Sequence, residues 1–345
     1  MNFWAKLSKP FFALAPLEDV TDAAFRRLIA KYGKPDVMFT EFTSADGLVL
    51  ADAGGRNKLR KKLLYADSER PVVAQLFTAI PEHMEKASAL VEGLGFDGVD
   101  INMGCPDRAV EKSGCGAALI KNPALARELI RAAKKSSLSV SVKTRIGYNK
   151  DELDTWLPEL LAEEPAAITI HARTRKEMSD VPARWDAIAR AVEIRDEMRC
   201  STLIIGNGDV KDIADARAKA KATGCDGVML GRAIFGNPWL FSDLARAEHN
   251  DLRSRYRVEV TQEERLRALR EHLELFDELL ADTVSYAVMK KHFKSYVSGW
   301  NGAKDLRTKL MATSRLAEAR RILGTVDTLQ NMGYFRGRFG LKRRQ

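Results

Sequence analysis

Residues 98–106 read Gly-Val-Asp-Ile-Asn-Met-Gly-Cys-Pro, a short strand pattern that ends in a tight turn carrying an asparagine and a cysteine. The same outline recurs along the first 250 residues: a short apolar or β-branched run, then polar residues, then a longer stretch with helical periodicity. Several runs are apolar throughout instead of alternating, which is typical of parallel strands covered on both faces.

Eight such runs alternate with helical patterns. They span residues 11–17, 37–42, 72–77, 98–105, 139–145, 167–173, 202–207 and 227–231. Between them we expect a first helix capped by Thr21 and ended by Gly33, and further helices at 80–94, 123–135 and 212–222. This alternation predicts a (β/α)8 TIM barrel. A doubly wound open sheet is the alternative, but no G-x-G-x-x-G turn opens a helix after an early strand.

Strand signals stop near residue 250. Residues 261–280, 284–300 and 303–323 then show amphipathic helical periodicity, which predicts a small all-α helical bundle. We therefore place a TIM-barrel catalytic domain at residues 1–250 and a basic helical domain at residues 251–345.

No apolar run approaches the roughly 18 residues that a membrane span needs, and no targeting segment is recognisable. We therefore expect a cytoplasmic protein without a membrane partner. The four cysteines lack the paired spacing of metal sites, so no metal is expected.

The positive charge is concentrated at one end of the chain. Residues 290–345 hold 14 lysines and arginines against 3 acidic residues, a net +11, which leaves −2 for residues 1–289 out of the total of +9. A basic segment on a near-neutral body favours a polyanion partner. From charge alone, a solvated basic face and attraction to an anionic membrane stay open.

Candidate site residues are sought at the C-terminal ends of the strands, where barrel active sites lie. Gln75, Lys143 and His171 belong to this set and could hydrogen-bond a flavin ring, with Lys143 stabilising the reduced, anionic ring. A structural role is the common fate of a lone strand histidine. A lysine within an apolar strand is costly unless it has a partner, so Lys143 favours a functional role.

The last two strands end in glycines that suit a phosphate site. Gly206, Gly208 and Gly231 allow close backbone approach, Arg232 can pair with the phosphate, and we expect Asn237-Pro238 to open a helix that adds N–H donors. These residues do not distinguish FMN from a sugar phosphate.

Cys105 lies in the tight turn after the fourth strand. A thiol with an unperturbed pKa of about 8.5 is mostly protonated at neutral pH and can donate a proton without prior activation. A buried, inert thiol is the alternative, and it is the interpretation we favour for Cys115, Cys200 and Cys225.

Together these segments resemble the tRNA-dihydrouridine synthase family, in order along the whole barrel. The matching stretches are residues 15–26, 40–42, 73–76, 100–106, 116–119, 142–147, 170–175, 207–209 and 227–233. The chain departs from the family pattern at Leu17-Glu18-Asp19, at residues 113–116 and in the loop 176–184.

The resemblance implies an FMN-dependent enzyme that reduces a uridine base in tRNA to 5,6-dihydrouridine, with NADPH or NADH as the reductant and Cys105 as the general acid. It implies that Asn102, Arg145 and Arg175 lie near the uracil. The implied FMN contacts are Pro16, Leu17, Glu18, Gln75, Lys143, His171, Asn207, Gly208, Asp209, Gly231 and Arg232.

We further expect the protein to be a monomer whose basic helical domain binds tRNA. Two rival functions fit the sequence less well. An FMN barrel acting on a small molecule leaves the basic segment unexplained, and a flavin-free RNA-binding protein leaves the polar strand ends unexplained.

Overall fold

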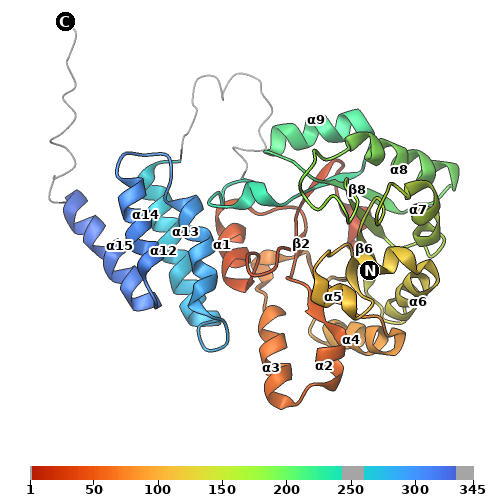
Figure 1. The fold of residues 1–345 in the computed structure, drawn as a ribbon, viewed down its shortest axis with the longest axis horizontal. Coiled ribbons are helices and arrows are strands. Elements are labelled where there is room, and N and C mark those ends of the chain that lie inside the picture. Colours follow the sequence, from red (N-terminus) through yellow and green to blue (C-terminus); the bar gives the residue numbers. More distant parts are fainter. Residues whose placement is uncertain (1, 243–259, 332–345) are drawn as a thin grey trace, which may run out of the picture. The chain divides into compact units, whose positions relative to one another are not determined.

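The computed structural model describes residues 2–242 and 260–331 (Figure 1). In these residues all paired strands run parallel in one sheet of order β1-β9-β8-β7-β6-β5-β4-β2, with β3 paired to β4. The strands are β1 (Phe11–Leu14), β2 (Met38–Phe39), β3 (Thr43–Ser44), β4 (Val72–Phe77), β5 (Gly98–Met103), β6 (Ser139–Arg145), β7 (Ala167–His171), β8 (Leu203–Asn207) and β9 (Gly227–Leu230).

The sheet closes between β1 and β2. A parallel bridge joins Ala13 to Val37, and the backbone N–H of Leu14 donates to the Val37 carbonyl at 3.1 Å. The TIM-barrel prediction is therefore confirmed. The run 37–42 is not one strand. Both β2 and β3 pair with β4, and between them the hydroxyl of Thr40 accepts from the backbone N–H of Gln75 at 3.1 Å, which interrupts the backbone pairing with β4.

Helices lie between the strands and wrap the sheet (Figure 1). They are α1 (Ala23–Gly33), α2 (Ala45–Leu50), α3 (Ala53–Lys62), α4 (Pro81–Gly93), α5 (Arg108–Lys112), α6 (Pro123–Ala133), α7 (Leu153–Leu161), α8 (Trp185–Glu197) and α9 (Ile213–Thr223). The periodicity predicted α1, α4, α6 and α9 individually, but not α2, α3, α5, α7 or α8. The first helix ends at Gly33 as expected, but Asp22 caps it, accepting from the Phe25 N–H at 2.8 Å. Thr21 instead accepts from the Leu17 N–H at 2.8 Å, which closes the preceding turn.

One end of the barrel interior is filled by an aromatic cluster. The ring of Trp4, which is 1% exposed, packs against the rings of Phe3, Phe11 and Phe39. Small and branched side chains from the strands complete this layer. Burial of such large apolar surfaces is the main stabilising contribution to the barrel, and it leaves the opposite end free for polar side chains.

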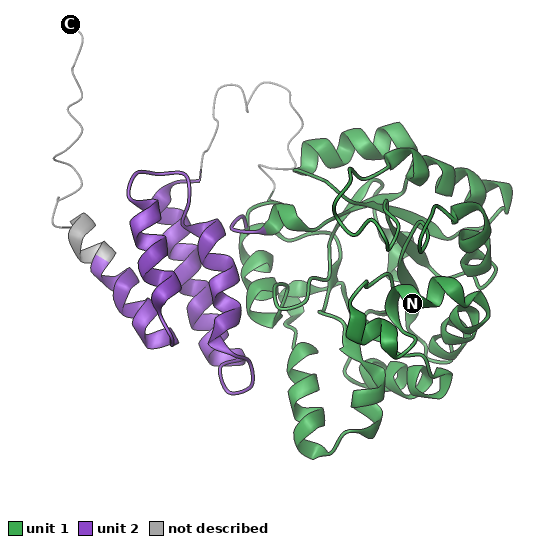
Figure 2. Ribbon diagram, viewed as in Figure 1, with its two compact units in different colours: residues 1–234, 238–248 green, residues 235–237, 249–345 purple. Residues whose placement is uncertain are grey.

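The chain divides into two compact units, residues 1–234 with 238–248 and residues 235–237 with 249–345 (Figure 2). The described helices of the second unit are α12 (Gln262–Leu279), α13 (Met289–Tyr296), α14 (Ala303–Ala312) and α15 (Leu316–Asn331). Thr261 caps α12 in a capping box with Glu264. The roles expected for the two domains stay predictions.

Two helix predictions in this part of the chain were wrong. The run 303–323 forms two helices. The backbone is extended at Thr313, which ends α14, and the Glu318 carboxylate accepts from the Ser314 N–H at 2.8 Å at the start of α15. No helix opens at Asn237-Pro238 in the described residues, since residues 238–242 form turns after the short 3-10 helix η4 (Arg232–Ile234). None of the described helices is both long and apolar enough to cross a bilayer.

Candidate active site

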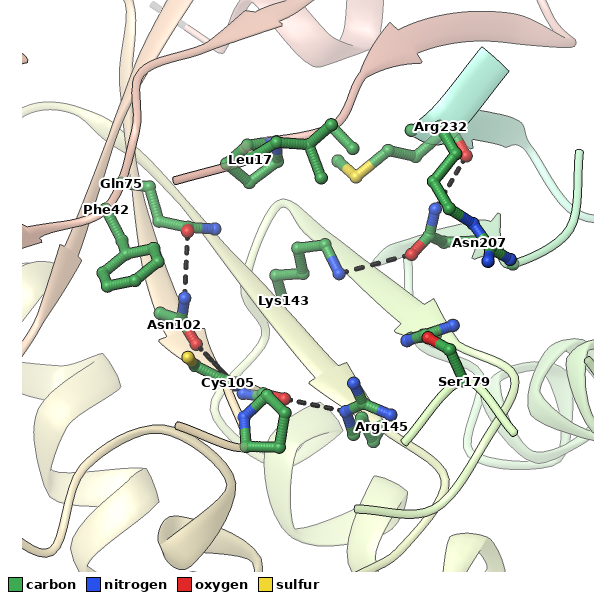
Figure 3. A pocket seen from close by; sticks show the side chains of 18 of the residues that line it. Leu17, Phe42, Gln75, Asn102, Cys105, Lys143, Arg145, Ser179, Asn207 and Arg232 are labelled. Atoms are coloured by element: carbon green, nitrogen blue, oxygen red, sulfur yellow. Dashed lines mark hydrogen bonds between the residues drawn. The ribbon is translucent and has the colours of Figure 1, made fainter. Parts of the chain in front are cut away.

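A pocket of about 340 Å³ opens at the C-terminal ends of the barrel strands (Figure 3). Its volume lies in the range of small-molecule and cofactor sites. The lining residues are Ala15, Pro16, Leu17, Phe42, Gln75, Asn102, Gly104, Cys105, Pro106, Lys143, Arg145, His171, Ser179, Asn207, Gly208, Asp209, Val210, Met229, Gly231 and Arg232.

The strand register brings the predicted site residues together. Asn102 of β5 is the partner of Lys143 of β6, and Arg145 of β6 is the partner of His171 of β7. His171 is in turn the partner of Asn207 of β8. Because neighbouring parallel strands end at the same edge, these side chains from distant parts of the sequence face one pocket.

A buried chain of polar side chains supports the floor of the pocket. The Asp100 carboxylate accepts from the Ser141 hydroxyl and the Gln75 amide, both at 2.6 Å. The Gln75 side-chain oxygen then accepts from the Asn102 amide at 3.0 Å. Burial raises the pKa of Asp100 to about 6, although these hydrogen bonds and the charge of Lys143 act to lower it. This arrangement fixes which way the Gln75 and Asn102 amides point.

The turn that carries Cys105 is held from several sides. The Asn102 oxygen accepts from the backbone N–H groups of Gly104 and Cys105, at 3.2 and 2.9 Å. The Cys105 carbonyl accepts from the Ala117 N–H at 2.9 Å. Gly116, at φ +62°, lies so close that a Cβ there would stand 2.7 Å from the Cys105 carbonyl oxygen, so only glycine suits this position.

The environment of Cys105 keeps its thiol protonated. Burial raises the thiol pKa above its ordinary value, while the charges of Arg145 and Lys143 favour the thiolate more weakly. A protonated thiol beside two cations can give up a proton and leave a thiolate that those cations stabilise. Cys115 and Cys225 are buried and lie outside the pocket lining, as does the half-buried Cys200.

Lys143 and His171 form the centre of the pocket. Burial lowers the pKa of Lys143 to about 8, and the neighbouring charge of Arg145 adds to this effect. Its ammonium donates to the Asn207 side-chain oxygen at 3.3 Å. Burial and four surrounding cations lower the pKa of His171 to about 2, so this ring is neutral. Its Nε2 faces the Arg173 guanidinium at 3.1 Å and must accept, which places the proton on Nδ1.

The predicted phosphate loop follows β8. Gly208 adopts φ +125°, and a Cβ there would stand 2.8 Å from Ala183 and 3.1 Å from the His171 ring. The Asp209 carboxylate pairs with both Arg173 and Arg232, and these contacts lower its pKa. The lining cations Lys143, Arg145 and Arg232 therefore outnumber the lining anion, and a phosphate-bearing ligand suits this excess.

Arg145 ties two loops together at the pocket. Its Nε donates to the Gly104 carbonyl at 2.8 Å, and its Nη1 donates to the carbonyls of Thr174 and Met178, each at 3.1 Å. The Cys105 turn and the loop that contributes Ser179 are thus held by one guanidinium. The sequence singled out Arg145 but made no prediction for this loop.

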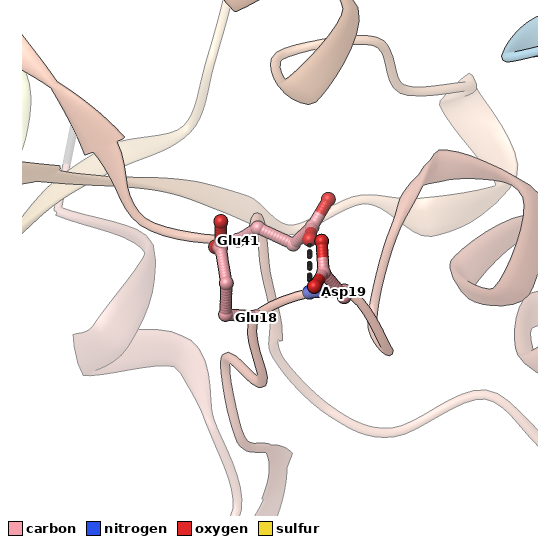
Figure 4. Close-up of side chains that lie close together, drawn as sticks. All are labelled: Glu18, Asp19 and Glu41. Atoms are coloured by element: carbon pink, nitrogen blue, oxygen red, sulfur yellow. Dashed lines mark hydrogen bonds between the residues drawn. The ribbon is translucent and has the colours of Figure 1, made fainter. Parts of the chain in front are cut away.

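Three predicted site residues do not line the pocket. Gly206 packs against Trp185, where a Cβ would stand 2.5 Å from the ring. Arg175 pairs with Glu111 of α5 and lies over the Tyr148 ring, 5.4 Å from its centre. Glu18 pairs with Lys62. The carboxylates of Glu18, Asp19 and Glu41 also lie together, each with an oxygen within 4.8 Å of the others (Figure 4). The roles predicted for Glu18 and Arg175 stay untested.

The acidic cluster is partly neutralised from within the chain. Lys62 supplies a cation at Glu18, and the Asp19 N–H donates to Glu41 at 2.6 Å. Burial, then the charge of Asp22, raises the pKa of Glu41 to about 7, so the protonated form of this carboxyl is favoured relative to an ordinary glutamate. No metal is assigned to these three carboxyl groups.

Sequence reasoning missed several lining residues. Phe42, Ser179 and Met229 were not proposed, nor was Asp100 beneath the pocket. Phe42 and Met229 lie in the predicted strand runs 37–42 and 227–231, so their positions could have indicated the pocket. Apolar residues in a strand are usually interpreted as part of the hydrophobic core. Ser179 lies in a loop whose path no local pattern predicts.

The profile of the family "Dihydrouridine synthase (Dus)" matches residues 13–332 of this chain. The chain belongs to the dihydrouridine synthase family. A protein of Staphylococcus aureus (strain COL) named "Probable tRNA-dihydrouridine synthase" is 42% identical over 324 residues, which is 93% of this chain and 94% of that protein. "Probable tRNA-dihydrouridine synthase 2" of Bacillus subtilis (strain 168) is also 42% identical, over 93% of this chain and 95% of that protein.

Among solved structures, the 6-hydroxypseudooxynicotine amine oxidase of Pseudomonas geniculata N1 superposes with a TM-score of 0.50 at 12% identity. The match covers 67% of this chain and 46% of that one, and it concerns the fold alone. The family profile and the 42% identical relatives confirm the resemblance to the family. Asn102, Gly104, Cys105 and Pro106, from the turn after β5, line the pocket at the barrel mouth.

Proposed function

We propose that this family member reduces a uridine base in tRNA to 5,6-dihydrouridine, using bound FMN that NADPH or NADH reduces. The observation that carries the proposal is a cysteine held in a hydrogen-bonded turn at the edge of a cation-rich pocket at the barrel mouth, where burial raises the thiol pKa. The names of the relatives support tRNA as the substrate.

The side chains of the pocket suit FMN. Lys143, the Gln75 amide and the Nδ1–H of His171 offer donors for the polar edge of a flavin, and Leu17 and Met229 offer apolar contact. Arg232 and the open backbone at Gly231, where a Cβ would meet nothing closer than 3.6 Å, suit its phosphate. Bound FMN would supply hydride to the pyrimidine ring.

The protein's own contribution to the second step is the proton. A hydride added at C6 of uracil leaves negative charge that a proton at C5 must neutralise, so that the C5–C6 double bond becomes a single bond. Cys105 would donate that proton through its sulfur, and the resulting thiolate would face Arg145 and Lys143 before solvent reprotonates it. Asn102 and Arg145 keep the turn, and so the thiol, in place.

The target base must leave its stack to enter the pocket, which costs a few kcal/mol. The basic helical unit could offset this cost through phosphate contacts. We accordingly propose that residues 1–250 bind FMN, that residues 251–345 bind tRNA, and that the enzyme works in the cytoplasm, where tRNA is found.

The test uses the purified full-length chain. We expect a yellow protein that releases FMN and not FAD on denaturation, and that forms dihydrouridine in tRNA from cells lacking this enzyme when NADPH is added. Free uracil and uridine should be poor substrates. A colourless protein that FMN does not reconstitute would overturn the cofactor, and efficient reduction of free uracil would overturn the tRNA substrate.

A further inference from the structure

Helix α3 is a basic surface on the barrel unit that the pocket chemistry does not explain. Its sequence, Ala-Gly-Gly-Arg-Asn-Lys-Leu-Arg-Lys-Lys at residues 53–62, holds five cations and no acidic residue. None of its ten residues is buried. Figure 1 shows α3 beside α2 at the edge of the barrel. The helix therefore contributes little to the core.

The sequence of α3 works against its own stability. Arg56 and Arg60 stand four residues apart, as do Lys58 and Lys62, and like charges at this spacing repel on a helix. Two glycines in the first turn add to the cost. The helix is held by Asp52, whose carboxylate accepts from the Gly55 N–H at 2.7 Å, and by Leu59, which packs on Gly47 of α2. Folding alone gives no reason for the cations.

Three of these charges have no acidic partner. Among the described residues, Arg56, Lys58 and Arg60 form no ion pair. Elsewhere on the barrel, exposed arginines such as Arg127 and Arg131 share an acidic residue, in that case Glu163. The excess positive charge of α3 is thus presented to solvent, where it attracts polyanions.

The side chains of α3 also form a recess. Ala53, Gly54, Arg56, Asn57 and Arg60 line a shallow hollow on the helix surface. Two guanidinium groups with an amide between them and no side chain at Gly54 suit a phosphate group, which guanidinium groups bind through paired hydrogen bonds.

The helix leads to the active-site pocket. At its C-terminal end, Lys62 lies 5.8 Å from the centre of the Phe42 ring, and Phe42 lines the pocket. A helix of ten residues is about 15 Å long. The C-terminal end of α3 therefore lies at the pocket wall, and the guanidinium pair of Arg56 and Arg60 lies on another face of the helix, within about two turns of that end.

We propose that α3 binds backbone phosphates of the RNA substrate next to the nucleotide whose base enters the pocket. This inference rests on the proposed function, because it takes the pocket to receive an RNA base. Contacts to phosphates carry no base information but fix the position of the strand. In this arrangement α3 sets where the strand lies at the pocket, separately from the basic helical unit.

The test compares two variants of the full-length, FMN-loaded enzyme that lose the same charge. The first, Arg56→Gln with Arg60→Gln, removes the guanidinium pair of the recess. The control, Arg199→Gln with Lys221→Gln, removes two exposed cations without an ion pair among the described residues, one after α8 and one in the last turn of α9. The tRNA affinity is measured as a function of salt, together with kcat and KM.

We expect the α3 variant to weaken tRNA binding and raise KM by roughly 3- to 30-fold, and to lower the salt slope by about two units, one for each lost phosphate contact. Its kcat should stay within about twofold of the wild type, since neither residue reaches the reacting atoms. The control should match the wild type in all three quantities. Far-UV circular dichroism confirms that α3 variants keep their helix content.

The outcomes separate this inference from the proposed function. If the wild type forms dihydrouridine and both variants bind tRNA equally well, the α3 proposal is wrong and the proposed function stands. If the wild type forms no dihydrouridine in any tRNA but the α3 variant alone loses tRNA binding, the proposed reaction fails and the RNA surface stands. Loss of binding to phosphatidylserine vesicles, with tRNA binding intact, would overturn the RNA proposal.

Discussion

The side-chain oxygen of Asn102 accepts a hydrogen bond of 2.9 Å from the backbone N–H of Cys105. Asn102 is in turn oriented by Gln75, and Gln75 by the buried carboxylate of Asp100. The position of the thiol is therefore set from the barrel interior and not by the turn alone.

Cys105→Ala should separate the two half-reactions. Flavin reduction by NADPH needs no thiol and should proceed at a near-normal rate. Oxidation of the reduced flavin by tRNA should slow by roughly 10²- to 10⁴-fold, the usual effect of removing a positioned general acid. Stopped-flow absorbance measures both rates after bound FMN has been confirmed. Cys115→Ala, on a buried thiol, is the control; a silent Cys105 variant or a dead Cys115 variant would refute the assignment.

Asn102→Ala should misplace the thiol. Two backbone N–H groups would lose their acceptor, at a cost of about 1–3 kcal/mol each when they stay buried. We expect a lower melting temperature and at least a tenfold slower oxidation of reduced flavin by tRNA. Asn122→Ala is the matched control, because Asn122 also accepts from a backbone N–H, that of Leu125 at the start of α6. It should lose stability and keep its rate; equal rates in both variants would contradict the role of Asn102.

Lys143 should give flavin reduction a dependence on pH. Its pKa is lowered to about 8, so the ammonium that favours anionic reduced flavin is present below that pH and lost above it. The rate of flavin reduction should fall as pH rises through about 8. Lys143→Met should be slow, with a more negative flavin potential and no such fall, whereas Lys143→Arg should stay charged above pH 8. A pH profile of Lys143→Met that matches the wild type would exclude this role.

The helical unit should contribute to tRNA affinity through its own cations. Neutral replacements of Lys290, Lys291, Lys294, Arg320 and Arg321 should weaken tRNA binding and lower its salt slope by about one unit for each lost phosphate contact. Because Arg320 already pairs with Asp277, it should contribute less to tRNA affinity than it would as an unpaired cation. Flavin reduction by NADPH serves as the internal control. Unchanged tRNA affinity would place the RNA surface elsewhere.

A buried histidine pair should make the helical unit sensitive to acid. His272 of α12 and His292 of α13 are fully buried, with ring centres 4.5 Å apart. Burial lowers the pKa of His292 to about 3 and that of His272 well below its ordinary value. In the unfolded chain histidine takes up its proton near pH 6.5. The unfolded state therefore binds more protons below pH 6.5, and stability is lost as pH falls from there toward 3.

At pH 5, His292 alone should cost about 2 kcal/mol of unfolding free energy, from 1.36 kcal/mol for each unit below 6.5. Urea unfolding of the full-length protein at pH 7.5 and pH 5.0 measures the difference. His292→Phe should reduce it, since an apolar ring takes up no proton. An equal loss in the wild type and in His292→Phe would show that other groups cause the acid sensitivity.

Local patterns predicted much of the barrel. The runs 72–77 and 139–145 became β4 and β6 with the same bounds, because a continuous apolar run between turn residues leaves few other solutions. Helix ends were less certain. Thr21 and Asp22 are both good caps by type, and only the path of the preceding turn, closed by Thr21 on Leu17, left the cap to Asp22.

The site was predicted where the strand ends themselves supply the residues. Gln75, Lys143, His171 and Asn207 line the pocket because parallel strands end at one edge. Glu18 and Arg175 stand next to such ends in sequence, but their partners Lys62 and Glu111 draw them away from the lining. Ser179 reaches the pocket from a loop held by Arg145, which no periodicity indicates.

The sequence by itself determined the alternation of strands and helices, the family, and the turn that carries Cys105, since each of these depends on residues adjacent along the chain. Only the tertiary structure decided the partners of those residues: Asp100 beneath Gln75, Arg145 between two loops, and Lys62 at the end of α3 over the Phe42 ring. The physical reason is that hydrogen bonds, burial and charge act over a few ångströms in space. Closing the barrel brings together groups that are tens of residues apart.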